Sequence, residues 1–281
     1  MASIDQVISK RHAGFIAWPT IFFAFICFFA FIVCLVVAAL KLIPLALAFF
    51  INLVLSYMAF TPFHEAAHGN IKGKYYSLKS LEICIGYMMG LMLLGPFHSF
   101  AFIHLTHHAH TNEGKEDPDF WVHGSNYWQV LGHCLTILPY YYWFFFTSKK
   151  RAARSVFAIS IITVLIFIIL MFIIGSLSSI KILFFTWLLP SILANAFLAF
   201  FLDYIPHHPH STHERYKNSN VIYGKLIYLI SMAHSFHVVH HLWPKIPFYC
   251  YKKVFFEQEN LLIENQTPIF DSLSKLLFKN V

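Results

Sequence analysis

The chain has 281 residues, of which 58% are hydrophobic and only 12% are charged. Together with a mean hydropathy of +0.62, this composition excludes a soluble globular domain and indicates an integral membrane protein. The 20 Lys and Arg outnumber the 13 Asp and Glu and give a formal net charge of +7. We expect this excess to attract anionic lipid headgroups or an acidic protein partner, and we expect no nucleic-acid partner.

Four uncharged runs predict membrane-spanning helices, because a helix needs roughly 20 apolar residues to cross a bilayer. In chain order the predicted spans are 15–40, 42–60, 155–175 and 182–202. The shorter stretch 83–97 predicts a re-entrant or interfacial segment, and 130–146, which ends in a run of aromatic residues, predicts helices lying along the membrane. We therefore expect an all-α integral membrane protein with four transmembrane helices plus interfacial helices, in which residues 1–281 form a single membrane-embedded domain.

Three histidine clusters, HEAAH, HLTHH and HVVHH, lie outside the four runs. Their members are His64, His68, His104, His107, His108, His237, His240 and His241. Spacings of three and four residues place the histidines of each cluster on one face of a helix. Eight imidazoles exceed the needs of one ion, and neutral imidazole suits iron, zinc, copper and nickel. The leading hypothesis is a centre of two non-haem irons with positions left open for a reactant.

The distribution of positive charge predicts the orientation in the membrane. If both termini lie inside, Lys41 and Lys181 are the only Lys or Arg on the outer side. The residues just before the third span that mark the inner side as the cytoplasm are Lys149, Lys150, Arg151 and Arg154. We therefore expect both termini and the histidine-rich metal site to be cytoplasmic, at the membrane boundary, where a substrate could enter from the bilayer.

Two other classes of protein share part of this pattern. HEAAH also matches HExxH, in which two histidines bind zinc and the glutamate, here Glu65, activates water in a membrane metalloprotease. The third alternative is a non-enzymatic metal-binding or haem-binding membrane protein. Transporters usually carry polar ligands within their spans, however, and a haem would use only two histidines. The di-iron hypothesis alone uses all three clusters.

At these clusters the chain resembles the membrane fatty acid desaturase superfamily, which includes fatty acyl desaturases and lipid and carotenoid hydroxylases. The resemblance covers roughly residues 45–255. The extended motifs HLTHHAHTNEGKEDPDFW, FLDYIPHHPH and HVVHHLWPKIPFYCY are most similar to the bacterial and cyanobacterial beta-carotene hydroxylase branch.

By this resemblance the eight histidines are iron ligands, and a ninth ligand comes from the segment 206–210. His207 is preferred to His208 and His210, because it keeps the offset from Asp203 of the family's DYxPH pattern. The residues expected to accept the distal N–H of ligating imidazoles are Asp117, Asp119 and Asp203. The DPD sequence that contains the first two suits a turn equally well.

The implied activity is O2-dependent oxidation of unactivated C–H bonds in a long-chain lipid. Desaturation of a fatty acyl chain and hydroxylation of a carotenoid ring both remain open, with the carotenoid slightly favoured. The implied cofactors are two iron ions, with O2 as co-substrate. The sequence has no nucleotide-binding motif, so we expect electrons from an external ferredoxin-like or cytochrome-type donor. Aromatic residues that could either line a substrate channel or anchor the chain in the membrane are Phe97, Phe100, Trp121 and Trp128.

Overall fold

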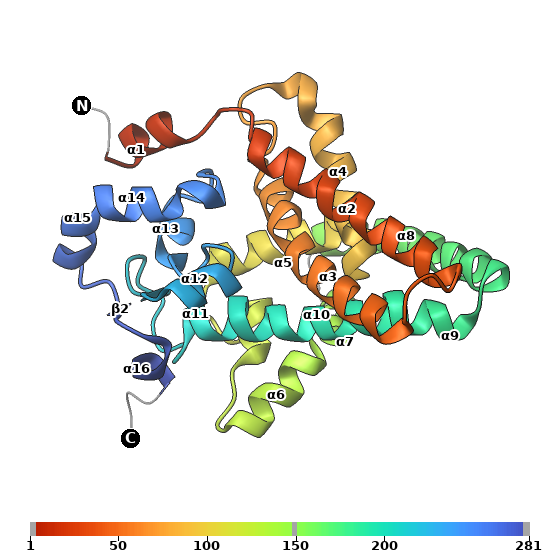
Figure 1. Ribbon diagram of the computed structural model, residues 1–281. Coiled ribbons are helices and arrows are strands. Elements are labelled where there is room, and N and C mark those ends of the chain that lie inside the picture. The colour runs from red at the N-terminus through yellow and green to blue at the C-terminus, as the bar shows by residue number, and fades with distance from the viewer. Residues whose placement is uncertain (1–3, 148–150, 278–281) are drawn as a thin grey trace.

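The computed structural model describes residues 4–147 and 151–277, which are mostly helical (Figure 1). The long helices are α2 (Trp18–Ala39), α3 (Leu45–His68), α4 (Lys79–Leu93), α5 (Phe97–His110) and α8 (Arg151–Leu177). A further helix, Ile180–His207, comprises α9 (Ile180–Leu183), the π-helical turn η3 (Phe184–Leu188), α10 (Leu189–Leu198), the π-helical turn η4 (Ala199–Tyr204) and α11 (Ile205–His207).

The remaining elements are short. In chain order they are α1 (Ile4–His12), η1 (Tyr76–Leu78), η2 (Pro118–Val122), α6 (Tyr127–Leu135), α7 (Ile137–Thr147), β1 (Val221–Ile222), α12 (Lys225–Ile230), α13 (His237–Leu242), η5 (Phe248–Cys250), α14 (Tyr251–Glu257), α15 (Glu259–Glu264), β2 (Ile269–Phe270) and α16 (Leu273–Leu277). The two strands pair in parallel, with Val221 opposite Ile269. Within the described residues this pair is the one departure from the predicted all-α fold.

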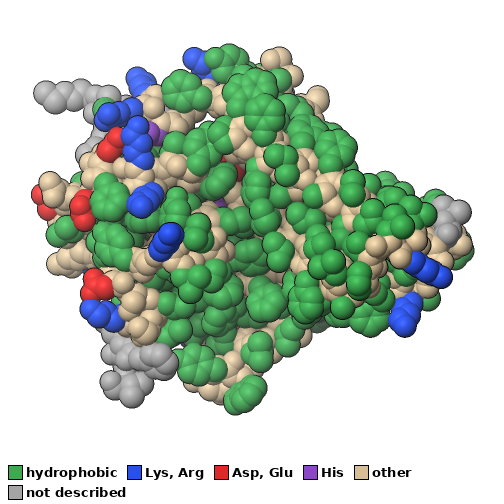
Figure 2. All heavy atoms as spheres, in the orientation of Figure 1, with side chains coloured by type: hydrophobic (Ala, Val, Ile, Leu, Met, Phe, Trp, Pro, Cys, Tyr) green, Lys and Arg blue, Asp and Glu red, His purple; other side chains and the backbone are tan. Residues whose placement is uncertain are grey.

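Within the described residues, four helices are long and apolar enough to cross a membrane, which agrees with the number of spans predicted. They are Trp18–Ala39, Leu45–His68, Arg154–Ser176 and Ile180–His207. The second and fourth helices run further than predicted. The end of the second carries His64 and His68, and the end of the fourth carries His207. Only 17% of the apolar window of Arg154–Ser176 is buried, and hydrophobic side chains cover the face over α2, α3 and α10 (Figure 2). Lipid would cover these side chains.

Both ends of the chain pack at the end of the molecule that carries the histidines. Ile8 of α1 shares a buried cluster with Val254 and Phe255 of α14, and His12 Nε2 lies 2.6 Å from Glu257 Oε2. Most charged side chains in Figure 2 gather over α1, α14 and α15. Of the cluster that predicts the inner side, Lys149 and Lys150 lie outside the described residues.

Helices α4 and α5 meet at a bend of 94°. α4 packs against α2, α3 and α10. α5 then returns to the end of α3, as the distance of 2.8 Å between His104 Nε2 and His68 Nε2 shows. This return favours the predicted re-entrant segment over a single broken span. The predicted interfacial stretch 130–146 forms most of α6 and α7, which both contact α10.

The end of α4 has backbone carbonyls that no further helical turn can satisfy, and leaving them unpaired in a lipid environment costs several kcal/mol each. Side chains of the last span donate to them. The bonds are Trp187 Nε1 to Leu91 O (3.0 Å), Ser191 Oγ to Met92 O (2.6 Å) and Asn195 Nδ2 to Leu93 O (2.8 Å). The last span therefore fixes where α4 stops and where α5 turns back toward the histidines.

The bend also depends on Gly90. A Cβ at this position would lie 2.4 Å from the backbone oxygen of Gly95 and 3.2 Å from the Phe63 ring. The Gly95 backbone cannot move aside by changing a rotamer, so only glycine lets the turn approach α4 this closely. Gly69, at φ 71°, similarly ends α3 directly after His68.

We predict that Gly90→Ala destabilises the protein by roughly 1–3 kcal/mol, because the added methyl group overpacks the turn. Gly132→Ala in α6 is the matched control, since a Cβ there meets nothing within 4 Å. Thermal unfolding in detergent should show a lower Tm for Gly90→Ala and an unchanged or higher Tm for Gly132→Ala. Equal Tm values for the two variants would contradict this account of the bend.

Candidate metal centre

The structure brings nine histidines together in two adjacent groups, in each of which the possible ligand atoms all lie within 4.8 Å of one another. The first group is His64, His68, His104, His108 and His240. The second group is His107, His207, His237 and His241. The groups touch, with the His108 and His241 rings 4.4 Å apart. These are the eight histidines of the three clusters together with His207.

The first group draws on three helices. The Nε2 atoms approach in a chain, with 2.8 Å from His68 to His104, 3.1 Å from His104 to His108, 2.7 Å from His108 to His240 and 3.0 Å from His240 to His64. Each Nε2 carries at most one proton, and lone pairs that face each other repel. A cation bound between them would turn this repulsion into attraction, so the donor set fits a metal ion.

The second group is arranged in the same way. His241 Nε2 lies 3.4 Å from His107 Nε2 and 3.1 Å from His237 Nε2. The His207 ring lies 4.8 Å from the rings of both His237 and His241. His207 Nε2 is buried and has no hydrogen-bond partner among the described residues. An ion in this group would supply the missing partner.

Helix periodicity explains how the ligands are divided between the groups. On α5, His104 and His108 lie one turn apart and join the first group, while His107 points to the second. On α13, His237 and His241 join the second group and His240 the first. The HxxHH spacing therefore lets one helix contribute to two neighbouring histidine groups. The π-helical turn η4 lies just before His207, in keeping with the tendency of such turns to lie near functional sites.

The distal nitrogens of several imidazoles meet acceptors that fix the tautomer. With Nε2 turned to an ion, Nδ1 carries the proton and donates it. His107 Nδ1 lies 2.9 Å from Asp117 Oδ1, and His207 Nδ1 lies 2.8 Å from the Asn218 carbonyl. His240 Nδ1 lies 2.9 Å from the Tyr251 hydroxyl. Such contacts hold the ring orientation and raise ligand basicity.

Burial makes the third cluster suitable for metal binding. It lowers the pKa of His237, His240 and His241 well below the usual value, and the neighbouring histidines lower it further. The three imidazoles are therefore neutral near pH 7, and the neutral form has the lone pair that binds a metal.

The three aspartates expected near the ligands differ in position. Burial opposes ionisation of Asp117, but the charge and hydrogen bond of His107 prevail and lower its pKa. Asp119 Oδ2 lies 3.6 Å from His107 Nδ1, and Asp119 Oδ1 accepts a 2.7 Å hydrogen bond from the Tyr141 hydroxyl. Burial raises the pKa of Asp119 to about 6. Asp203 lies against the cavity between the two groups and makes no hydrogen bond to an imidazole within the described chain.

Several contacts of the site were not predicted from the sequence. Tyr251 lies ten residues after the third cluster, and the Asn218 contact is a backbone carbonyl, so neither leaves a spacing signal. Lys245 Nζ donates to the carbonyl oxygen of His68. The sequence leaves Glu65 open between a support for His64 and a surface charge; it is fully buried, and its Oε1 lies 3.8 Å from His64 Nδ1.

Cavities that share lining residues connect the histidines with an apolar space. The central cavity, about 240 Å³, is lined by Phe60, His64, His104, His107, Asp119, Leu202, Asp203, His234 and His237. It touches ligands of both groups. A second cavity of about 410 Å³ shares Phe60, His104, Asp119 and Asp203 with it and continues past Tyr141 and Asn195.

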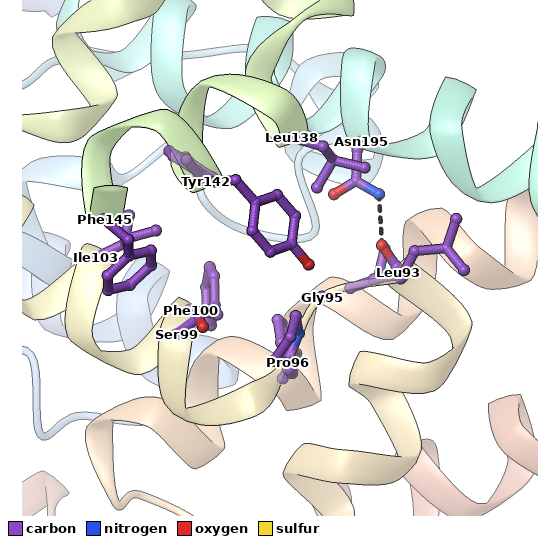
Figure 3. Close-up of a pocket in the computed structure, with 13 residues that line it drawn as sticks. Leu93, Gly95, Pro96, Ser99, Phe100, Ile103, Leu138, Tyr142, Phe145 and Asn195 are labelled. Atoms are coloured by element: carbon purple, nitrogen blue, oxygen red, sulfur yellow. Dashed lines mark hydrogen bonds between the residues drawn. The ribbon is translucent and has the colours of Figure 1, made fainter. Parts of the chain in front are cut away.

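A third space, the apolar cavity, shares Phe63, Leu93, Phe100, Tyr141 and Asn195 with the second cavity and measures about 440 Å³. Figure 3 shows Tyr142 and Phe145 of α7 facing Ser99 and Phe100 of α5 across it, with the bond from Asn195 to Leu93 at one side. Of the four aromatic residues considered for a channel, Phe100 lines this cavity. Trp128, in contrast, is 82% exposed.

Comparison with known families identifies one match. A family model described as fatty acid desaturase matches residues 42–271, which include all three histidine clusters and His207. No curated protein matches the chain in the comparison made.

We predict that His240→Ala removes the ion of the first group and lowers bound metal from about two ions per chain to about one, because a lost ligand weakens metal affinity strongly. His98→Ala is the control, since His98 bonds Tyr87 away from both groups. Metal content of the purified proteins, measured by elemental mass spectrometry, tests this. A wild-type chain with a single zinc ion, or a His240→Ala variant with full loading, would contradict the assignment of two ions.

Proposed function

Because the chain belongs to the fatty acid desaturase family, we propose that it is an O2-dependent di-iron oxidoreductase that attacks an unactivated C–H bond of a long-chain lipid. The observation that carries the proposal is the pair of histidine groups, with five and four imidazole nitrogen donors in contact with one another. Imidazole suits iron among other transition metals, and the family match favours two non-haem irons.

Two bound irons would supply the oxidising power that removes hydrogen from the substrate. Desaturation would convert two C–H bonds and dioxygen into an alkene and two water molecules, with two electrons and two protons from the donor. Hydroxylation would use the same electrons and protons and give an alcohol and one water molecule. The placement of the substrate carbon decides between the two outcomes.

The residues of the chain bind and orient the substrate and exclude water. The apolar cavity, between α5 and α7, offers a lipid chain a surface of Phe, Leu and Tyr side chains. The second cavity continues toward the histidines past Tyr141, whose hydroxyl donates to Asp119. Asp119 Oδ2 lies 3.6 Å from His107 Nδ1, so this carboxyl group stands beside the second group. These features support a substrate that enters from the bilayer.

A carotenoid ring is the substrate favoured by the extended motifs around His104, His207 and His237, and a fatty acyl chain is the other candidate. Expression in a host that makes beta-carotene tests both, with pigments and fatty acids analysed side by side. We expect hydroxylated carotenoid with the wild-type chain and none with His240→Ala, which loses an iron ligand.

The possible products lead to different conclusions. New unsaturated acyl chains in place of hydroxylated pigment would support the oxidoreductase and refute the carotenoid assignment. An iron-loaded chain that receives electrons but changes neither pigments nor acyl chains would contradict the proposed function.

The metalloprotease alternative requires Glu65 to activate a water molecule on a metal ion held by His64 and His68. Glu65 Oε1 instead lies on the Nδ1 side of His64, at 3.8 Å. The same oxygen lies 3.4 Å from Asn70 Nδ2. The Nε2 atoms of His64 and His68 face the other histidines of the first group and not Glu65. The metalloprotease alternative also leaves the second group without a role. The geometry therefore favours the oxidoreductase.

The external electron donor is an acidic protein of the ferredoxin or cytochrome type in this proposal, and the histidines and both termini face the cytoplasm. Lys252 and Lys253 are exposed on α14, directly after Tyr251, which contacts the ligand His240. Lys245 contacts the backbone of the ligand His68. A donor bound on these three lysines would lie close to α3 and α13, two of the three helices that hold the first group.

We predict that replacing Lys252 and Lys253 by Gln slows reduction of the irons by an acidic ferredoxin about tenfold at low salt, because electrostatic steering raises association rates. Reduction by dithionite, which needs no docking surface, is the control and should not change. Stopped-flow absorbance measures both rates. Reduction by ferredoxin that is insensitive to ionic strength and to these substitutions would refute the docking surface.

A further inference from the structure

His234 is a tenth histidine at the centre, and it is buried. It lies three residues before α13, is 1% exposed and lines the central cavity. Its ring is 5.0 Å from the His64 ring and 6.2 Å from the His237 ring. It nevertheless belongs to neither of the two groups whose ligand atoms lie within 4.8 Å of one another. The position is beside the ions, not in their ligand sets.

The hydrogen bonds of His234 define which of its nitrogens carries the proton. Nδ1 lies 3.0 Å from the Ser231 carbonyl oxygen and 3.2 Å from the Met232 carbonyl oxygen. Carbonyl oxygens only accept, so Nδ1 carries the proton and Nε2 of the neutral ring is an acceptor. Nε2 is buried and has no hydrogen-bond partner among the described residues. A buried acceptor without a donor is costly unless a ligand or water supplies one.

The backbone before His234 is held in an unfavourable conformation that fixes the ring. Met232 and Ala233 have φ values of 48° and 71°, in the left-handed region that costs non-glycine residues of order 1–3 kcal/mol each. The turn is held by bonds from Ala233 N to Tyr228 O and from Ser235 N to Ser231 Oγ, 2.9 and 2.8 Å long. Two consecutive strained residues, held by surrounding bonds, keep Nε2 at the central cavity.

We propose that His234 is a positioning residue whose Nε2 accepts a hydrogen bond from a water or hydroxyl group in the central cavity, between the two histidine groups. The inference rests on the proposed function, because the cavity touches ligands of both groups and is where oxygen chemistry would take place. Asp119 and Asp203 line the same cavity, so His234 supplies a neutral acceptor beside two carboxyl groups. An acceptor at this point fixes which way the oxygen-bound hydrogen points.

Two substitutions of His234 distinguish the role of the Nε2 acceptor from that of the other ring atoms. His234→Asn retains a donor for the Ser231 carbonyl and removes the acceptor at Nε2, whereas His234→Gln can place its amide oxygen near the Nε2 position. The matched control is His210→Asn. His210 is also buried, and its ring is also 6.2 Å from that of His207. Neither of its nitrogens has a hydrogen-bond partner in the described part of the chain, but His210 does not line the central cavity.

The experiment uses the full-length protein loaded with iron and records metal content, the Mössbauer spectrum and the rate at which the reduced centre reacts with O2. We expect His234→Asn to keep about two irons, to change the Mössbauer spectrum and to react roughly tenfold more slowly, as the loss of one strong hydrogen bond predicts. We expect His234→Gln to recover most of the rate and His210→Asn to match the wild type.

Two results would overturn the proposal. A wild-type spectrum and rate in His234→Asn would exclude the hydrogen bond, and a loss of about one iron in His234→Asn with full loading of His210→Asn would make His234 a ligand. Neither result affects the proposed function, because the wild-type chain still holds iron in both cases. A wild-type chain that binds no iron would overturn both the proposed function and this inference.

Discussion

Mutual repulsion among buried imidazole lone pairs is the constraint on which the rest of the structure depends. In the first group, five Nε2 atoms approach in steps of 2.7 to 3.1 Å in an interior that excludes water. Any two neighbouring nitrogens that both lack a proton repel each other, and a cation between them would turn this repulsion into attraction. The helices bring the rings together, and bound metal ions would hold them there.

The membrane part of the molecule serves this requirement. The second and fourth spans extend beyond their apolar runs and carry ligands on their ends, while the re-entrant pair α4 and α5 returns a third set to the same level. The turn between α4 and α5 needs Gly90 for space and the polar side chains of the last span for its carbonyls. Residues of the apolar region that belong to neither histidine group thus position the site.

Much of this architecture could be predicted from local patterns. Hydropathy predicts the four spans because each apolar run is long and uncharged. The i, i+3 and i+4 spacing predicts that the histidines of each cluster share one helix face. The assignment of His104 and His107 to different groups could not be predicted, because it depends on how α5 is rotated against α3 and α13. Tyr251 and His234 were not identified because their roles come from tertiary contacts. Phe97 packs against Gly86, which shows that an aromatic residue near a cluster need not line the channel.

The order of the ligands along the chain has a consequence for biogenesis. The first group takes histidines from the second span, α5 and α13, and the second group takes them from α5, α11 and α13. Neither set of donors is complete until α13, which follows all four spans in the chain, has been synthesised. A chain that is still being inserted therefore lacks both complete donor sets, and metal loading would follow membrane insertion.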